Sequence, residues 1–315
     1  MSTGATLAEG VLAGDQLAAA RLMRLVDDRR PGYQQQLAAL WPHGGKAQVI
    51  GITGNPGSGK SSLVDLLTAR FRAQGRRVGV LAVDPSSPFS GGAILGDRIR
   101  MQHHSADPGV FIRSLATRGA LGGLTASTAD TVVVMEALGL DPIIVETVGV
   151  GQDEVDIARV AHCTVVVTVP GLGDEIQNLK AGILEIADLF VVNKADREGA
   201  DKVASELVQM QRLGVEQQDV PVLLTSTRTG AGLDQLVAAI AQHRDQLLAG
   251  QGWHRRELLR AGRHLRTLAV EAFLKRNHLA SEEQGPAELL ESIVARRLDP
   301  WSAAQTILER QGALP

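Results

Sequence analysis

The sequence predicts a wound α/β fold in which a mostly parallel sheet carries additional helices at both ends of the chain. Three observations lead to this prediction. Short β-branched apolar runs alternate with helical segments, these runs are continuously apolar, and the segments before and after them show only helical periodicity. Continuously apolar strands are typical of a sheet that helices cover on both faces. Ligands of such sheets bind where the carboxyl ends of the strands meet.

The chain before the first expected strand has the pattern of helices. Residues 7–41 carry leucines at helical spacing, and Pro31-Gly32 interrupts the pattern. A proline-glycine pair marks a turn, so this stretch predicts two amphipathic helices packed beside the sheet. We expect residues 1–46 to form an N-terminal helical extension.

The sheet is predicted from seven apolar runs. They cover residues 48–53, 78–84, 110–115, 142–147, 164–169, 189–193 and 221–225. Because helical segments separate the runs, they are expected to form one main domain over residues 47–250.

The last part of the chain has no strand pattern. Near residue 250 leucines begin to recur at helical spacing beside several arginines, which predicts a helix with an apolar face and a basic, solvated face. A short helix pair, broken at Gly285-Pro286 and Asp299-Pro300, is expected to follow. Residues 251–315 are too few to build a core of their own, so this C-terminal arm should lie on the main domain or on a second subunit.

Composition narrows the class of protein. The 315 residues include 32 Lys and Arg against 35 Asp and Glu, a net charge of −3, which gives no overall electrostatic reason to expect nucleic acid or an anionic membrane as partner. Cys163 is the only cysteine, which excludes an internal disulfide and a CxxC site. No apolar run approaches the roughly 20 residues of a membrane span. We expect a soluble, cytoplasmic protein.

A glycine-rich loop after the first strand carries the clearest chemical signal. The sequence GNPGSGKSS fits the Walker A pattern, in which backbone N–H groups and a helix N-terminus surround phosphate oxygens. Lys60 would reach the β and γ phosphates, and the Ser61 hydroxyl would ligate Mg²⁺. The predicted phosphate-binding residues are Gly54, Asn55, Pro56, Gly57, Ser58, Gly59, Lys60, Ser61 and Ser62.

A second motif favours guanine as the base. Asn193-Lys194-Ala195-Asp196 follows the sixth run, and the Asp196 carboxylate can accept hydrogen bonds from guanine N1–H and its 2-amino group. Opposite adenine it would lose both, at a cost of about 1–3 kcal/mol per unpaired buried group. Asp196 could instead cap the helix that follows. Ser226 and Thr227 could offer backbone donors to the base, although any polar turn after a strand has this appearance.

Further acidic residues are candidates for the metal ion and the attacking water. Glu146 ends a buried strand in the sequence ETVG, where it can hold magnesium through water while the Gly149 N–H meets the γ-phosphate. Asp84 ends the second strand and Asp97 lies in a glycine-rich segment, and each could instead cap a turn or helix. Gln152 could orient the water or face solvent.

Seven segments together resemble one protein family. GITGNPGSGKSSL, VLAVDPSSP, GGAILGDRIRM, FIR followed by LGGL, VETVGVGQDE, GDEIQNLKAG and VVNKAD occur in the order found in the MeaB/ArgK/MMAA family of P-loop GTPases. The resemblance covers nearly the whole chain. It implies a GTPase (G) domain over residues 47–250 and a C-terminal helical dimerisation arm over residues 251–315.

The resemblance also implies a function. Such proteins are homodimeric GTPase chaperones that convert GTP and water to GDP and phosphate, and their slow hydrolysis is accelerated by the client. They gate adenosylcobalamin loading, protection and reactivation of a B12-dependent acyl-CoA mutase, usually methylmalonyl-CoA mutase. Mg²⁺ with GTP or GDP is the implied cofactor, and no tightly bound organic cofactor is expected.

Individual roles follow from the same resemblance. The positions that match the acids around the metal and the attacking water are Asp84, Asp97 and Glu146, beside Ser61 as a metal ligand. Lys180 lies in a loop, residues 171–182, that resembles the third switch, and it is the candidate cation for transition-state charge. Many relatives have two adjacent basic residues where this chain has Lys180-Ala181. The expected catalytic set is Lys60, Asp84, Asp97, Glu146, Gln152 and Lys180.

Two other functions share parts of this pattern. A GTP-dependent metallochaperone of the nickel-delivery type has the same core but should carry a Cys or His cluster, and His103 and His104 are expected to be surface residues. An ATP-dependent kinase linked to amino-acid transport is the other alternative, which Asn193 and Asp196 oppose.

Overall fold

The computed structural model of the chain describes residues 6–84, 104, 106–116, 126–147, 153–171, 185–213, 219–279 and 286–312. Two compact units divide the chain, residues 1–260 and residues 261–315. The larger unit holds the sheet and the candidate site, and the smaller unit is helical. The expected domain limits after residues 46 and 250 stay a prediction.

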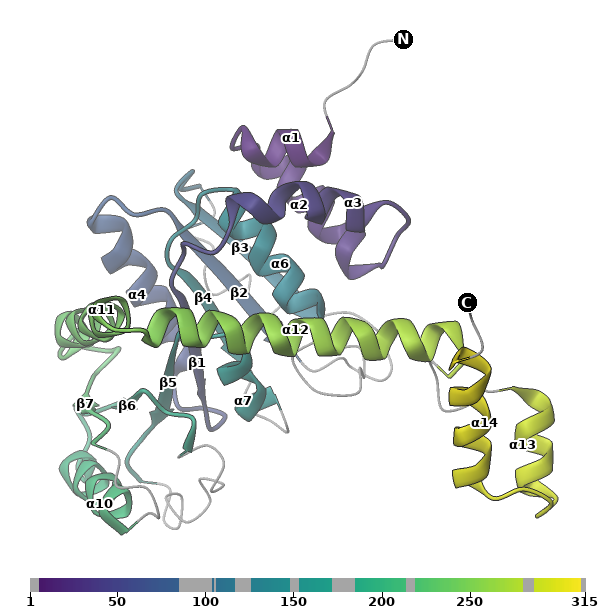
Figure 1. The fold of residues 1–315 in the computed structure, drawn as a ribbon. Helices are drawn as coiled ribbons and strands as arrows, with labels where there is room; N and C mark the ends of the chain where they lie inside the picture. Colours follow the sequence, from purple (N-terminus) through teal and green to yellow (C-terminus); the bar gives the residue numbers. More distant parts are fainter. Residues whose placement is uncertain are drawn as a thin grey trace. The chain divides into compact units, whose positions relative to one another are not determined.

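All seven predicted runs form strands. These are β1 (Val49–Gly54), β2 (Val78–Asp84), β3 (Val110–Ala116), β4 (Ile143–Thr147), β5 (Cys163–Thr168), β6 (Leu189–Val192) and β7 (Val222–Leu224). They pair in parallel in the order β3-β2-β4-β1-β5-β6-β7, so β1 lies at the centre (Figure 1). The wound α/β fold is therefore confirmed.

Helices cover both faces of this sheet, which explains why its strands are continuously apolar. The helices of the domain are α4 (Lys60–Ala73), α6 (Ala126–Ala137), α7 (Asp153–Asp156), η3 (Ile157–Arg159), α10 (Ala200–Leu213) and α11 (Leu233–Ala249). In β1, Val49 belongs to the core beneath α6, whereas its neighbour Ile50 belongs to the core beneath α4 and α11. Successive strand residues point to opposite faces, so both must be apolar when both faces are covered.

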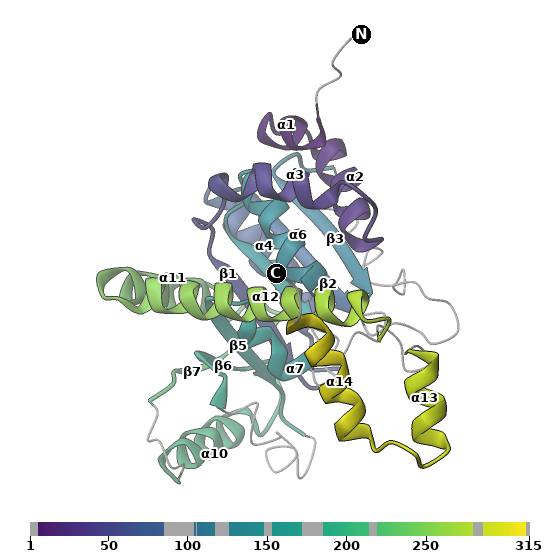
Figure 2. The ribbon, with the colours of Figure 1, turned by 45° about the vertical axis from the view of Figure 1, so that its right-hand side comes forward.

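The N-terminal extension contains one more α-helix than predicted, and a short 3-10 helix follows. It consists of α1 (Leu7–Leu12), α2 (Gln16–Asp27), α3 (Tyr33–Leu40) and the short η1 (Trp41–His43). The additional break lies at Gly14, which has a φ of 85°, and the Asp15 carboxylate caps α2 by accepting from the N–H of Leu17 at 2.7 Å. Helices α2 and α3 pack on α6, on the same side in both ribbon views (Figures 1 and 2).

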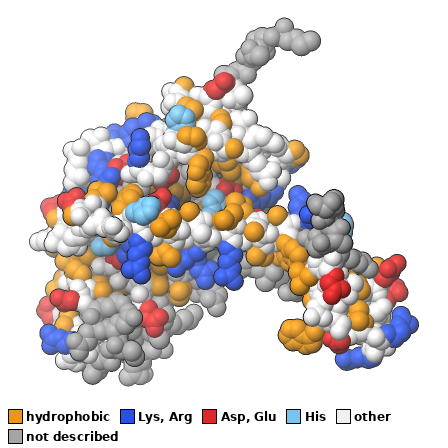
Figure 3. Space-filling view, in the orientation of Figure 1, with side chains coloured by type: hydrophobic (Ala, Val, Ile, Leu, Met, Phe, Trp, Pro, Cys, Tyr) orange, Lys and Arg blue, Asp and Glu red, His pale blue; other side chains and the backbone are white. Residues whose placement is uncertain are grey.

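The C-terminal segment is helical, as predicted. It begins with α12 (Gly252–Arg276), which spans the boundary between the two units, and ends with α13 (Ala287–Val294) and α14 (Pro300–Gly312). Several large apolar side chains are exposed, among them Leu265 at 70% and Trp301 at 83%. The space-filling view shows apolar and basic side chains together along α12 (Figure 3). Within the described residues, no helix combines the length and hydrophobicity needed to span a bilayer.

The prediction that the arginines of α12 form a solvated face is wrong for two of them. Arg256 donates to the His162 carbonyl at 2.6 Å and also binds the Asp188 carboxylate, while Arg260 contacts Glu257 and the His162 ring. His162 and Asp188 directly precede β5 and β6, so the first turns of α12 are bound to the end of the sheet opposite the glycine-rich loop. The contacts with His162 and Asp188 join residues more than 60 positions apart, which helical periodicity cannot reveal.

Candidate functional site

The glycine-rich loop connects the central strand to α4, and two of its glycines are required by their surroundings. Gly54 has a φ of 132°, and a Cβ there would lie 2.0 Å from the Val167 carbonyl oxygen of β5. Gly59 has a φ of 89°, and a Cβ there would lie 2.5 Å from Asn193 Nδ2. A side chain at either position would combine a left-handed backbone with a steric clash. The loop can approach its neighbours this closely only with glycine.

Two polar side chains of the loop are arranged to meet an anion. The buried Lys60 ammonium donates to the carbonyl oxygens of Gly54 at 2.7 Å and Asn55 at 3.0 Å. The buried hydroxyl oxygen of Ser58 has no hydrogen-bond partner among the described residues. A phosphate oxygen would give Ser58 its missing partner and Lys60 a charged acceptor, and hydrogen bonds between charged groups are the stronger ones.

A serine and a glutamate meet beside this loop. Ser61 Oγ donates to Glu146 Oε1 at 2.6 Å, because Ser61 is in the first turn of α4 while β4, which carries Glu146, pairs directly with β1. Glu146 is buried and lies opposite Ile52 in the β1–β4 register. The structure therefore brings together two of the oxygen donors that the sequence suggests for a metal ion.

This pair fits Mg²⁺. Magnesium prefers oxygen ligands, and it usually keeps several waters and binds one or two carboxylates plus substrate phosphates. Asp84 ends β2, which also pairs with β4, so its backbone reaches the same edge of the sheet. Among the described residues no three His, Cys, Asp or Glu side chains gather as a metal site on their own. The Ser61 hydroxyl and the Glu146 carboxylate are thus suited to an ion whose remaining ligands come from a bound nucleotide and from water.

Asn193 joins the glycine-rich loop to the loop after β7. Its buried side chain donates from Nδ2 to the Ser58 carbonyl at 2.8 Å and accepts at Oδ1 from the Thr227 N–H at 3.2 Å. The next residue, Lys194, has a positive φ of 57° and donates from Nζ to the Gly57 carbonyl at 2.7 Å. A non-glycine residue in this conformation is uncommon, and Arg29, His278 and Arg296 share it elsewhere in the chain. Asn193 and Lys194 thereby join three segments that are far apart in sequence: the glycine-rich loop, the loop after β6 and the loop after β7.

The Asp196 carboxylate faces the loop after β7. Ser226 Oγ donates to Oδ1, and Arg228 Nε donates to Oδ2 at 2.9 Å. The hydrogen bond from Ser226, assisted by that from Arg228, holds the pKa of Asp196 below its usual value, so the carboxylate is ionised at neutral pH. Ionised, it can only accept, which is what guanine N1–H and the 2-amino group require. Both oxygens of Asp196 are thus bound by the loop after β7, and its role in binding guanine stays a prediction.

The structure adds one residue that the sequence analysis missed and corrects another. Arg228 was not predicted at the site, although a basic residue two positions after Ser226 was a visible signal. His104 was expected at the surface, but it is buried with Nε2 3.2 Å from Asp65 Oδ1 of α4. Cys163 is buried at the start of β5, and burial raises the pKa of its thiol well above the usual value.

The remaining predicted site residues are outside the described part of the chain. Asp97, Gly149, Gln152 and Lys180 lie there, as does the side chain of Asp84. Their catalytic and metal-binding roles stay predictions.

Known proteins resemble this chain over most of its length. The family model described as methylmalonyl Co-A mutase-associated GTPase MeaB matches residues 19–282. A putative GTPase of Pyrococcus horikoshii is 44% identical over 309 residues, which cover 96% of this chain and 97% of that protein. The GTPase ArgK of Escherichia coli is 35% identical over 296 residues, 90% of this chain and 89% of that protein. A crystal structure of an LAO/AO transport system kinase superposes with a TM-score of 0.71 at 26% identity, covering 99% of this chain and 100% of that one.

Proposed function

The chain belongs to the family of methylmalonyl-CoA mutase-associated GTPases called MeaB, and from this premise we propose that it is the chaperone of a B12-dependent acyl-CoA mutase. It is a P-loop GTPase. In the proposed role, GTP hydrolysis gates adenosylcobalamin loading, protection and reactivation of the client, with methylmalonyl-CoA mutase as that client. The family description supports this choice of client.

The proposal that the site binds GTP is supported by one observation. Asn193 links the phosphate-binding loop at Ser58 to the loop at Thr227, beside an ionised Asp196. The proposed phosphate and base subsites would thus be parts of one hydrogen-bonded unit, so a nucleotide bound at one end would meet preorganised groups at the other. A guanine that finds Asp196 ionised gains two charge-assisted hydrogen bonds that adenine cannot form.

The proposed chemistry is transfer of the γ-phosphoryl group to water. The loop amides and Lys60 hold the β and γ phosphates, and Ser61 and Glu146 would hold Mg²⁺, with Asp84 and Asp97 as further candidates. When bound, the ion would neutralise part of the phosphate charge. Gln152 is proposed to orient the water, whose oxygen attacks the γ-phosphorus while the bridging oxygen leaves with GDP and a proton of the water passes to solvent. Lys180 is proposed to stabilise the charge that develops on that oxygen.

The proposed coupling to a partner assumes that the site by itself hydrolyses GTP slowly. A partner that orders or supplies missing positive charge raises GTPase rates by about 10³- to 10⁵-fold in known cases. We propose that γ-phosphate contacts order the segments around Asp84, Glu146 and Lys180, and that hydrolysis releases them. The bound mutase would respond to this ordering and release of the three segments.

We further propose a homodimer formed through the C-terminal helices, and a cytoplasmic location. Leu258, Leu265, Val294 and Trp301 are each more than 60% exposed, and apolar side chains of this size on one segment favour burial against a second copy. The single cysteine fits a reducing compartment.

The test is to combine the protein with the mutase, adenosylcobalamin and GTP. GTP turnover should rise when the mutase is added, and cofactor transfer should depend on GTP. Lys60→Ala should abolish both effects, whereas Lys202→Ala, which removes an exposed lysine of α10 with an 81% exposed side chain, should change neither. Unchanged turnover and unchanged transfer on adding the mutase would refute the chaperone role.

An ATP-dependent kinase linked to amino-acid transport is the second candidate function, because the structure of the LAO/AO transport system kinase matches 99% of this chain. Its discriminating measurement is nucleotide preference. Tighter binding of ATP than of GTP would favour the kinase, and the reverse would favour the GTPase chaperone.

A further inference from the structure

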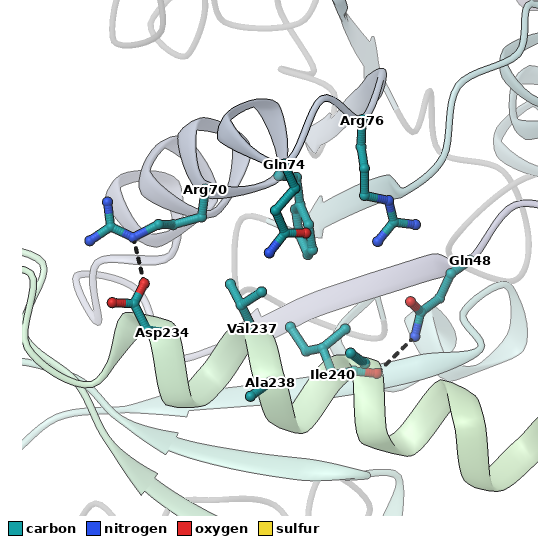
Figure 4. A pocket seen from close by; sticks show the side chains of 10 residues that line it. Gln48, Arg70, Gln74, Arg76, Asp234, Val237, Ala238 and Ile240 are labelled. Atoms are coloured by element: carbon teal, nitrogen blue, oxygen red, sulfur yellow. Dashed lines mark hydrogen bonds and ion pairs between the residues drawn. The ribbon is translucent and has the colours of Figure 1, made fainter.

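A cavity of about 220 Å³ lies between the end of α4 and the first half of α11, away from the nucleotide loops (Figure 4). Helix α4 begins at Lys60 in the glycine-rich loop and reaches the cavity at Arg70 and Phe71. Ten residues of helix span about 15 Å, so the cavity and the glycine-rich loop are at opposite ends of the same helix. None of the residues lining the cavity belongs to the candidate nucleotide site.

A buried amide at the cavity wall lacks a partner. Gln48, just before β1, is 1% exposed, and its Nε2 donates to the Ile240 carbonyl at 3.2 Å. That bond determines which end of the amide is nitrogen, and Oε1 has no hydrogen-bond partner among the described residues. Figure 4 shows the amide at the cavity with its oxygen turned away from Ile240. A buried carbonyl left in this state favours a ligand that brings an N–H or O–H group.

Arg76 is held at the opposite wall by the way α4 ends. Gly75 has a left-handed φ of 77°, and the Arg76 N–H then bonds the Phe71 carbonyl at 3.1 Å, which is the pattern of a Schellman cap. The Arg76 guanidinium consequently lies over the Phe71 ring, 5.3 Å from its centroid. Figure 4 shows Arg76 and Gln48 facing the same space. The helix cap thus fixes a cation beside an aromatic ring at the cavity.

The charges around the cavity leave an excess of one cation. Arg76 binds Asp141 at 2.9 Å, but Arg244 binds the same carboxylate at 3.0 Å. Arg70 and Asp234 form a separate pair at 2.8 Å near solvent. Among the described residues that line the cavity, two guanidinium groups, Arg70 and Arg76, stand against one carboxylate, Asp234. A planar guanidinium with free N–H groups is suited to bind a carboxylate or phosphate.

We propose that this cavity binds a small organic anion that has an apolar body and one hydroxyl or N–H donor. The anionic group would lie at Arg76, the donor would bond Gln48 Oε1, and the body would pack on Phe71 and the apolar side chains of α11. Cavities near 150 Å³ hold a benzene ring, so 220 Å³ accommodates a ring with a short substituent. The proposal is independent of the chaperone function.

Three matched probes test this assignment by NMR titration of the full chain saturated with GDP. They are 3-(4-hydroxyphenyl)propionate, 3-phenylpropionate, which lacks the hydroxyl donor, and 4-hydroxyphenethyl alcohol, which lacks the anion. The first should shift the Ile240 methyl and Gln48 amide resonances and bind roughly tenfold more tightly than the other two, since each lacks one hydrogen-bonding group. No shift at these resonances, or equal affinity for all three probes, would overturn the proposal.

Two variants and one control locate the site. Arg76→Met should weaken the first probe by about tenfold, whereas Arg24→Met, on an α2 arginine with a 79% exposed side chain, should leave its affinity unchanged. Asp234→Asn removes the partner of Arg70 and should tighten binding about two- to threefold, a gain that misfolding cannot imitate. GDP affinity should remain constant in all three. A probe affinity insensitive to both Arg76→Met and Asp234→Asn would refute the site.

Discussion

Replacing Gly59 with alanine tests whether the glycine-rich loop is held by its contact with Asn193. Gly59 has a φ of 89°, and a left-handed conformation costs a non-glycine residue about 1–2 kcal/mol. The new Cβ would also lie 2.5 Å from Asn193 Nδ2, which must then move from the Ser58 carbonyl it bonds at 2.8 Å. Losing that bond adds about 0.5–1.5 kcal/mol. We expect Gly59→Ala to lower the free energy of unfolding by about 2–3 kcal/mol.

Gly57 offers the matched control. Its φ is 77°, but a Cβ there meets nothing within 4 Å, so Gly57→Ala should incur only the backbone cost. Urea unfolding of both variants without nucleotide measures the difference, which isolates the Asn193 contact. GDP affinity should fall more for Gly59→Ala, because Asn193 also supports the loop after β7. Equal destabilisation by the two substitutions would refute this account of the loop.

Three further predictions concern the metal, the base and pH. Ser61→Ala removes the hydroxyl bonded to Glu146 and should reduce Mg²⁺-dependent GTP affinity by about tenfold or more, with little change when calorimetry is done without Mg²⁺. Asp196→Asn should weaken GTP by about 1–3 kcal/mol and leave ATP unchanged, whereas a parallel loss for both nucleotides would contradict its role in base selection. Burial lowers the pKa of His162 to about 4 from an ordinary value of 6.5, so the unfolded chain binds a proton that the folded chain excludes between these pH values. The stability associated with a neutral His162 should therefore be complete above pH 6.5 and fall by up to about 3 kcal/mol toward pH 4. In His162→Gln this part of the pH dependence of unfolding should disappear, and an unchanged profile would count against it.

Local sequence pattern was sufficient for the sheet and the phosphate loop. The four central strands β1, β4, β5 and β6 are buried along their whole length, so each is largely apolar over a short run of consecutive residues, and the more exposed β7 still shows a short apolar run. The glycine-rich loop was equally visible, since its conformation depends on glycines at fixed spacing. The helix break at Gly14 was missed, although a glycine followed by a capping aspartate is a local signal too.

Only the tertiary structure decided which side chains meet. The bond from Asn193 to Ser58 spans 135 positions, and that from Gln48 to Ile240 spans 192. Arg256 and Arg260 look like solvated helix residues until α12 is placed against the starts of β5 and β6, where they bind Asp188 and His162. Hydrophobic periodicity predicts which face of a helix or strand is buried. It does not predict which element packs against that face, because many elements have the same apolar pattern. The family and its chemistry could therefore be inferred from the chain, while the Arg228–Asp196 contact and the cavity at the end of α4 depend on how distant segments pack.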